Sequence, residues 1–248
     1  MDARIVFLFI YMGLLANNHA QITISNANPY NNSNHLINNV LLGGGVSANN
    51  VTYQGDLIQV GFFNAINSNL DIDSGIVLST GDIIDLDPNF FGFGNIPSST
   101  NSDPDLLSIA NSVPPLINQT FNVTGIFDVA TLEFDFIPNS DTLSFNYVFG
   151  SNEYLTWINS EYNDVFGFFI SGPGITGPYS SPSGFPNGSI NIANVPNSTP
   201  PLPITISSVN NLLNSQYYID NQSTFPQTIS CNGFTTSFTA TTVVQCGE

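Results

Sequence analysis

The segment between residues 151 and 164 carries the side chains with the clearest potential for chemistry. Together with one acid upstream, it offers oxygen ligands of the kind that Ca²⁺ prefers, namely Glu153, Asn163, Asp164 and Asp105. Further acids, Asp82, Asp85 and Asp87, lie on loops rich in Gly, Pro and Asn. None of these acids follows the twelve-residue EF-hand pattern. We therefore expect Ca²⁺ as the cofactor that this chain permits best, with the alternative that the acids only cap turns.

Three aromatic residues share this segment: Tyr154, Trp157 and Tyr162, of which Trp157 is the only tryptophan of the chain. Exposed aromatic rings can stack on sugars or anchor a protein partner. The alternative is that they fill the end of a β-sandwich core. We take them as candidate ligand-binding residues for a glycan or a protein surface.

Catalytic residues are not expected. A nucleophile activated by histidine would have to use His35, because the only other histidine, His19, lies in a predicted leader. One such histidine and two late cysteines provide no zinc-ligand spacing, and the glycines 43–45 lack the Lys of a phosphate-binding loop. Glu133 and Asp135 share one face of a predicted strand, where they could serve as a glycosidase pair, but neighbours of this kind are typical of a solvated face. We expect a protein that is not an enzyme.

Charge restricts the partners. Of the 18 acidic residues only Asp2 lies within residues 1–20, as does the single cation Arg4, so the remainder carries 17 acidic residues and no Lys or Arg. A net charge of −17 argues against nucleic acids and anionic membranes, which both require basic residues. It favours cations, neutral glycans and basic protein surfaces.

Residues 1–20 have the pattern of a secretory signal peptide. Arg4 precedes the apolar run 5–16, and a cleavage site is predicted between Ala20 and Gln21. The run is too short to span a membrane, and no transmembrane segment is predicted elsewhere. A buried N-terminal strand is the alternative.

Export makes a disulfide between Cys231 and Cys246 plausible, since oxidising compartments favour such bonds. Whether their Cα atoms approach closely enough does not follow from the sequence. We predict the bridge and keep a free pair as the alternative.

Alternation of apolar and polar residues predicts the elements. The run 131–136 places Leu and Phe on one side and acids on the other, and after the turn 138–141 the same period resumes at 143–149, which predicts a hairpin. A buried strand is predicted at 165–170, and the segment 105–112 is the only predicted helix. Short strands with turns of Gly, Pro and Ser predict an all-β, antiparallel two-sheet sandwich of jelly-roll type with long surface loops, in one domain from residue 21 to 248.

Three sequence motifs closely resemble those of the choice-of-anchor L domain and occur in the same order: DSGIVLSTGD (Asp73–Asp82), VFGSNEY (Val148–Tyr154) and NDVFGFFISGPG (Asn163–Gly174). Further motifs also match the family in their order along the chain, namely TLEFDFIP, NIANVP, QYYIDN and CNGFTTSFTA. The resemblance therefore covers nearly all of the chain after residue 20. This family consists of secreted bacterial modules joined to varying C-terminal anchoring or sorting segments. The resemblance implies a surface or secreted β-domain, and it implies little about a ligand, because the family is defined by its sequence.

In the resembling family, a further strand and then an anchor or sorting domain follow the position of Cys246–Glu248. The resemblance therefore implies that the last strand of the domain is missing here. A missing strand would expose a sheet edge or leave a groove in the core open.

Leader, charge and resemblance together predict a non-catalytic module, secreted or at the bacterial cell surface, that serves adhesion or ligand display and is stabilised by Ca²⁺. The alternative is a carbohydrate-binding domain or a glycan-active extracellular enzyme. A third possibility is a structural spacer without a ligand.

Overall fold

A computed structural model describes residues 21–42, 46, 48–66, 68–98, 100–222 and 227–247. The predicted signal peptide at residues 1–20 lies outside the described residues, as does the glycine run 43–45. Within the part of the chain that the structure describes, no helix combines the length and apolar character needed to cross a bilayer.

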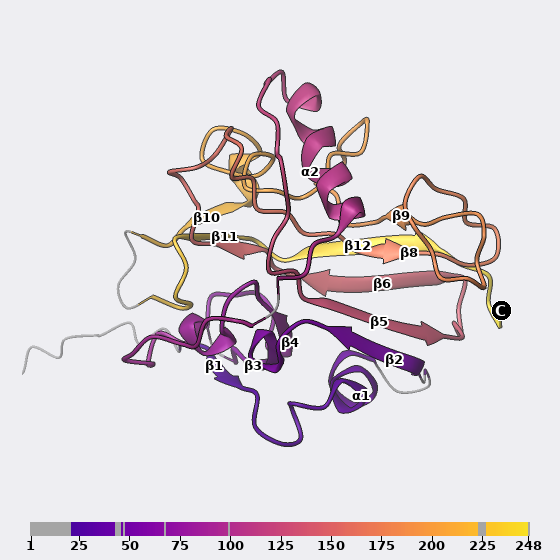
Figure 1. The fold of residues 1–248 in the computed structure, drawn as a ribbon, viewed down its shortest axis with the longest axis horizontal. Helices are drawn as coiled ribbons and strands as arrows, with labels where there is room; N and C mark the ends of the chain where they lie inside the picture. Colours follow the sequence, from indigo (N-terminus) through magenta and orange to yellow (C-terminus); the bar gives the residue numbers. More distant parts are fainter. Residues whose placement is uncertain are drawn as a thin grey trace, which may run out of the picture.

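Short strands dominate the described chain (Figure 1). The strands are β1 (Thr23–Ser25), β2 (Ala48–Gln54), β3 (Val60–Asn64), β4 (Ser74–Leu78), β5 (Thr131–Phe136), β6 (Thr142–Tyr147), β7 (Gly150–Ser151), β8 (Phe169–Ile170), β9 (Ile190–Asn191), β10 (Tyr218–Asp220), β11 (Gly233–Thr235) and β12 (Phe238–Val243). The helical pieces are α1 (Ser33–His35) with the π-helical η1 (Leu36–Leu41), the short 3₁₀ turns η2 (Leu57–Gln59), η3 (Ile83–Leu86) and η4 (Ser215–Tyr217), and α2 (Pro104–Leu116).

The strand ladders are antiparallel throughout the described chain, in small sheets with the orders β1-β3-β4, β10-β11-β7, β12-β6, β2-β5 and β8-β9. This arrangement, with little helix, confirms the predicted all-β sandwich. Figure 1 shows β6 and β12 lying across the middle of the molecule, with β5 and β2 below them and α2 projecting above. The long surface loops connect these small sheets.

A long two-part ladder, interrupted at residues 236–237, runs through the centre of the fold. On one side β11 is followed by β12, called the β11-β12 line below, and on the other side β6 is followed by β7. β11 pairs with β7 and β12 pairs with β6, so that Gly233 lies opposite Ser151 at one end and Val243 lies opposite Thr142 at the other. At about 3.3 Å per residue, this ladder spans on the order of 30 Å. It ties the C-terminal part of the chain to its centre.

The predicted hairpin between 131–136 and 143–149 is wrong, although both strands exist. Strand β5 pairs with β2, and β6 pairs with β12, so the two are not hydrogen-bonded to each other. The turn between them instead connects two layers, because Phe136 of β5 and Leu143 of β6 pack against the same buried cluster. Each strand must turn its apolar face inward, and facing layers satisfy this as well as a hairpin does.

Among the described residues, much of the buried apolar core falls into three clusters. The first contains Val113, Val195, Leu202, Ile204, Val209 and Phe238; the second contains Ile22, Ala65, Leu70, Cys231 and Phe234; the third contains Ile170, Ile175 and Val244. The β11-β12 line contributes Phe234 to the second cluster and Phe238 to the first. The long ladder therefore links separate parts of the core.

The predicted helix at 105–112 is present and is longer than expected. Asp103 caps its N-terminus, since Oδ1 accepts hydrogen bonds from the backbone N–H groups of Asp105 and Leu106, both at 2.8 Å. Pro104 occupies the first turn, where its missing N–H costs nothing. The helix continues through Pro114 to Leu116 even though proline normally ends a helix.

The predicted disulfide is wrong: Cys231 and Cys246 are both free, the first buried and the second exposed. They flank opposite ends of the β11-β12 line, so the length of that ladder separates them. A disulfide needs Cα atoms within about 7 Å. Cys231 packs instead in the second core cluster, where burial raises the pKa of its thiol to about 12.

Candidate functional site

The loop from Ser151 to Asp164, called the acidic loop below, follows β7 and holds most of the predicted site residues. Hydrogen bonds tie its backbone to the body of the protein: Gln222 Nε2 donates to the Tyr154 carbonyl at 3.0 Å, and the Asn159 N–H donates to Ser207 Oγ at 2.9 Å. A further bond, from the Trp157 N–H to the Glu153 carbonyl at 3.0 Å, closes a turn within the loop. The acidic loop therefore presents its side chains from a fixed backbone.

Two of the three predicted ligand-binding aromatics form an exposed pair. Trp157 is 42% exposed and Tyr162 is 55% exposed. Their ring centroids lie 4.7 Å apart in an edge-to-face arrangement with an interplanar angle of 64°. Ser160 joins them, because its Oγ donates to the Trp157 carbonyl at 2.6 Å and accepts from the Tyr162 N–H at 3.2 Å. The pair therefore presents two aromatic faces on a turn that hydrogen bonds hold in place.

Tyr154, the third predicted aromatic, belongs to the core. It is fully buried, and its ring lies 4.9 Å from that of Tyr218. Burial first, and then the nearby groups Tyr218, Cys231 and Asp164, raise the pKa of its hydroxyl. Full burial removes Tyr154 from the ligand-binding set and supports the core-filling alternative for this residue.

Two of the predicted metal ligands, Glu153 and Asp164, lie together at the base of the acidic loop. Ser151 Oγ donates to Asp164 Oδ2 at 2.6 Å and accepts from the Glu153 N–H at 2.8 Å. Burial, and then the charge of Asp164, raises the pKa of Glu153. Asp164 is an exposed residue overall, yet desolvation by the surrounding protein raises the pKa of its carboxyl against the opposing effect of the Ser151 hydrogen bond. The two carboxylates repel each other when both are ionised.

Asn163, another predicted ligand, is buried and bridges two elements. Pro114 has no N–H, so the Ala110 carbonyl of α2 lacks its usual helical donor. Asn163 Nδ2 lies 3.5 Å from this carbonyl and donates to it, while Asn163 Oδ1 accepts from the Ser207 N–H at 3.3 Å. This contact explains how α2 accommodates Pro114, and it gives the Asn163 side chain a structural role.

Asp105 does not join the other predicted ligands. It lies in the first turn of α2, and its Oδ2 accepts from the Ser180 N–H at 2.9 Å. Among the residues that the structure describes, no group of three or more His, Cys, Asp and Glu side chains is placed to hold a metal. The four predicted ligands therefore do not form one site.

The remaining candidates for chemistry lie apart from the acidic loop. Glu133 and Asp135 occupy the exposed face of β5, where Asp135 Oδ2 accepts from Asn50 Nδ2 of β2 at 2.7 Å. His35 ends α1, with its ring 5.8 Å from that of Tyr30. These positions agree with a solvated strand face and a partly exposed histidine.

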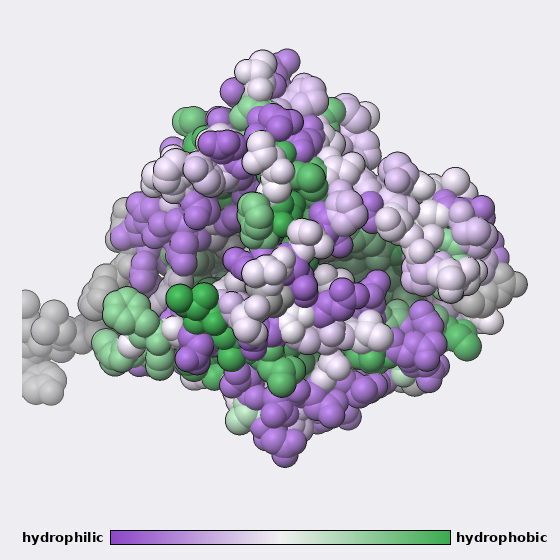
Figure 2. All heavy atoms as spheres, in the orientation of Figure 1, coloured by the Kyte–Doolittle hydropathy of each residue, from purple (hydrophilic) through white to green (hydrophobic). Residues whose placement is uncertain are grey.

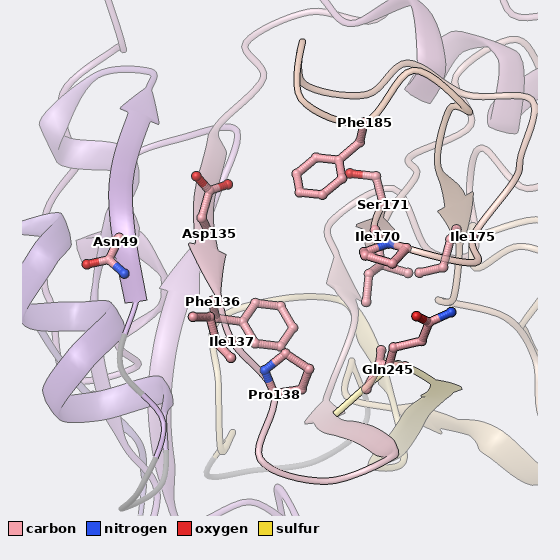
Figure 3. A pocket seen from close by; sticks show the side chains of 13 residues that line it. Asn49, Asp135, Phe136, Ile137, Pro138, Ile170, Ser171, Ile175, Phe185 and Gln245 are labelled. Carbon is pink, nitrogen blue, oxygen red and sulfur yellow. The ribbon is translucent and has the colours of Figure 1, made fainter. Parts of the chain in front are cut away.

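A groove with a free volume of about 230 Å³ opens at the far end of β5 (Figure 3). Figure 3 shows Phe136 and Pro138 on one side, with Ile170, Ile175 and Phe185 on the other. Phe136, Ile170 and Ile175 also belong to or pack on the third core cluster, so the groove is an open edge of that core. Sequence reasoning missed these lining residues because each has the pattern of an ordinary core residue.

Nearly the whole chain, residues 23–248, matches the family model described as the choice-of-anchor L domain. The chain matches no curated protein and no solved structure. Choice-of-anchor domains are surface-associated modules and are not known as enzymes. Since the match extends over far more than half of the sequence and agrees with the all-β architecture, the protein belongs to the choice-of-anchor L domain family.

Proposed function

We propose that this protein is a non-catalytic, extracellular or cell-surface binding module, which uses the Trp157–Tyr162 pair to contact a glycan or a protein surface in adhesion or ligand display. The observation that supports this most strongly is the exposed edge-to-face pair on an anchored turn. Aromatic rings of this kind provide a large contact area with little loss of conformational entropy.

Charge favours particular ligands for this surface. Glu153 and Asp164 lie in the same loop, and residues 21–248 contain no Lys or Arg. An acidic glycan would therefore meet repulsion with no cation to offset it, whereas a neutral glycan can stack on the rings and donate hydroxyls to the carboxylates. We propose a neutral glycan as the preferred class and a basic protein surface as the second.

Replacement of Trp157 by Ala tests the pair. Removing a ring that anchors a ligand should weaken binding by about 2 kcal/mol, or about 30-fold. The free energy of unfolding should change by no more than about 0.5 kcal/mol, because the ring is not in the core. Binding to a panel of neutral polysaccharides and urea unfolding measure the two effects.

The matched control is Phe127→Ala, which removes another exposed aromatic ring, 71% exposed, from a different loop. It should leave binding unchanged. If Trp157→Ala instead lowers stability by several kcal/mol and leaves binding intact, Trp157 is part of the core and the proposed role is wrong.

We also propose that Ca²⁺ binds between Glu153 and Asp164. Their repulsion and raised pKa values support this, because a divalent cation would relieve both. Ca²⁺ at 100 times its Kd should stabilise the protein by about 2.7 kcal/mol relative to a solution with excess chelator. Glu153→Gln should abolish this difference in thermal unfolding, while Glu133→Gln, on the exposed face of β5, should retain it. An unfolding temperature that is the same with Ca²⁺ and with chelator would refute the site.

The second candidate function is glycan hydrolysis. It is favoured by the same two carboxylates, since a raised pKa is what a general acid needs and aromatic rings beside it could hold a sugar. Release of reducing ends from a polysaccharide panel, lost in Glu153→Gln, would support this alternative. Binding without release supports the module that we propose, and a panel without any bound ligand would favour a structural spacer.

A further inference from the structure

A second surface is formed by the loop between η3 and α2, residues 88–97, called the apolar loop below. Three of its side chains are almost fully exposed: Phe91 at 96%, Phe93 at 100% and Ile96 at 92%. Figure 2 shows hydrophobic residues gathered at the left of this face, where the loop that precedes α2 runs in Figure 1. Scattered single apolar residues are normal on a protein surface, but a cluster like this one marks an interaction site.

Carboxylates hold the backbone of the apolar loop in place. Asp85 Oδ1 accepts from the Gly94 N–H at 2.6 Å, Asp82 Oδ2 accepts from the Asn95 N–H at 2.9 Å, and Asp87 Oδ1 accepts from the Asn89 N–H at 2.8 Å. Such charge-assisted bonds to backbone N–H groups are among the stronger hydrogen bonds in proteins. The rings are therefore exposed on an ordered frame.

The base of this frame rests on the core. Asp82 is buried, Leu86 packs against the second core cluster, and the Leu86 carbonyl accepts from the Ser230 N–H at 2.9 Å. At the far end, Ser98 donates through both its N–H and its Oγ to Asp56 Oδ2, at 3.0 and 2.6 Å. A loop that is already ordered loses little entropy on binding, which is what a docking surface requires.

Charge indicates what docks there. The carboxylates of Asp82, Asp85 and Asp87 bind the backbone of this loop, and residues 21–248 contain no Lys or Arg. In a symmetric contact between two copies, these acids would approach each other. Segments that insert into membranes pair their apolar residues with Lys or Arg and with interfacial Trp or Tyr, neither of which the apolar loop contains.

We propose that the apolar loop docks onto an apolar face of a protein partner that is flanked by Lys or Arg. Phe91 and Phe93 would contact the apolar face, and Asp85 and Asp87 would face the flanking cations. This surface is separate in sequence from the acidic loop and does not depend on the role of Trp157.

A model peptide reproduces this partner chemistry and tests the proposal. The probe is a fluorescent amphipathic helix with leucines on one face flanked by lysines, and its counterpart has glutamates in place of the lysines. In fluorescence anisotropy at low and high salt, the wild-type protein should bind the lysine peptide in a salt-dependent manner and should not bind the glutamate peptide. The double variant Phe91→Ser/Phe93→Ser should bind the lysine peptide at least tenfold more weakly, although its net charge is unchanged.

Leu212→Ser is the matched control, because Leu212 is 75% exposed on another loop, and it should bind within twofold of wild type. Phe93→Ser alone provides a milder variant, whose fully exposed side chain cannot affect folding through the core. Failure of the wild type to bind the lysine peptide, or equal binding by the double variant, would overturn the proposal. So would Phe91- and Phe93-dependent binding to phosphatidylcholine vesicles, or a dimer in sedimentation that the double variant abolishes.

Discussion

Carboxylates in this protein act chiefly through backbone N–H groups, because residues 21–248 contain no Lys or Arg with which they could pair. Several of them accept such bonds at turns or helix ends, among them Asp56, Asp82, Asp87 and Asp103, and Asp85 accepts from the distant Gly94 N–H. The sequence alone left open whether the loop acids bind calcium or cap turns. For Asp56, Asp82, Asp87 and Asp103 the structure supports capping.

Asp56 provides a prediction on acid stability. Hydrogen bonds from the Ser98 hydroxyl, and then from the Ser98 and Ile58 N–H groups, hold the pKa of Asp56 below its usual value of 3.8. A carboxyl with a depressed folded-state pKa contributes stability that is present above the unfolded pKa and is lost as the pH falls through the folded pKa. Asp56→Asn should therefore remove part of the loss of stability that the wild type shows between about pH 5 and pH 2.

Urea unfolding at a series of pH values measures this, with Asp141→Asn on an exposed turn as the control. The control should follow the wild-type pH dependence. Parallel curves for the wild type and Asp56→Asn would show that the Ser98 contact contributes nothing to the folding equilibrium.

At the scale of elements, the alternation in the sequence located β5 and β6 but not their partners. Alternation determines which face of a strand is buried, and a strand can bury that face against several different neighbours. The pairings of β5 with β2 and of β6 with β12 join residues far apart in the sequence, and no local signal specifies them. The turn at 138–141 is compatible with a hairpin or with a crossing between layers.

Burial of the segment Leu202–Asn210 could not be predicted from the sequence either. Its polar residues alternate with apolar ones, which predicts a strand with one solvated face, yet the whole segment is buried. Side chains satisfy its backbone: Ser208 Oγ donates to the Pro203 carbonyl at 2.6 Å, and Thr205 Oγ1 accepts from the Ser207 N–H at 3.2 Å. Hydrogen bonds from buried Ser and Thr side chains can thus satisfy backbone groups in place of strand pairing, and the composition of a segment does not show when they do so.

Asn163 joins α2 to the buried segment Leu202–Asn210, and its replacement tests the importance of this contact. Asn163→Ala should leave the buried Ala110 carbonyl without its donor, while the Ser207 N–H keeps its second acceptor, Thr205 Oγ1. An orphaned buried group costs about 1–3 kcal/mol, so the free energy of unfolding should fall by at least about 1 kcal/mol. Urea unfolding measures this against Asn122→Ala, an exposed asparagine that should cost under about 0.5 kcal/mol. Equal stabilities for the two variants would contradict the bridging role.

For the whole molecule, the fold class could be predicted and the site only in part. Short alternating runs between turn residues are enough to indicate an all-β sandwich, but exposure depends on packing. Trp157 and Tyr162 face solvent while Tyr154, only three residues before Trp157, is buried, and nothing in their residue types separates them. The cysteines are far apart because they flank opposite ends of the β11-β12 line, which requires knowledge of its pairing with β6 and β7.

The apolar loop shows the same limit. Its sequence NFFGFGN is flanked by prolines and follows several acids. The run of Phe and Gly without alternation was the only feature that set this segment apart in the sequence. Once the carboxylates are seen to hold its backbone, the described chain presents the apolar loop as well as the acidic loop on a body without Lys or Arg. This distribution suits a surface module that binds neutral or basic ligands.

Fluorescence of the single tryptophan shows whether the acidic loop is a ligand-contacting surface. Trp157 is 42% exposed and is the only tryptophan of the chain, so the emission reports on this loop alone. We expect emission that acrylamide quenches readily, and a saturable blue shift with protection from acrylamide when a neutral oligosaccharide or a basic protein ligand is titrated. Emission that is already blue-shifted and resistant to acrylamide, and that no ligand of either class changes, would contradict this role of the acidic loop.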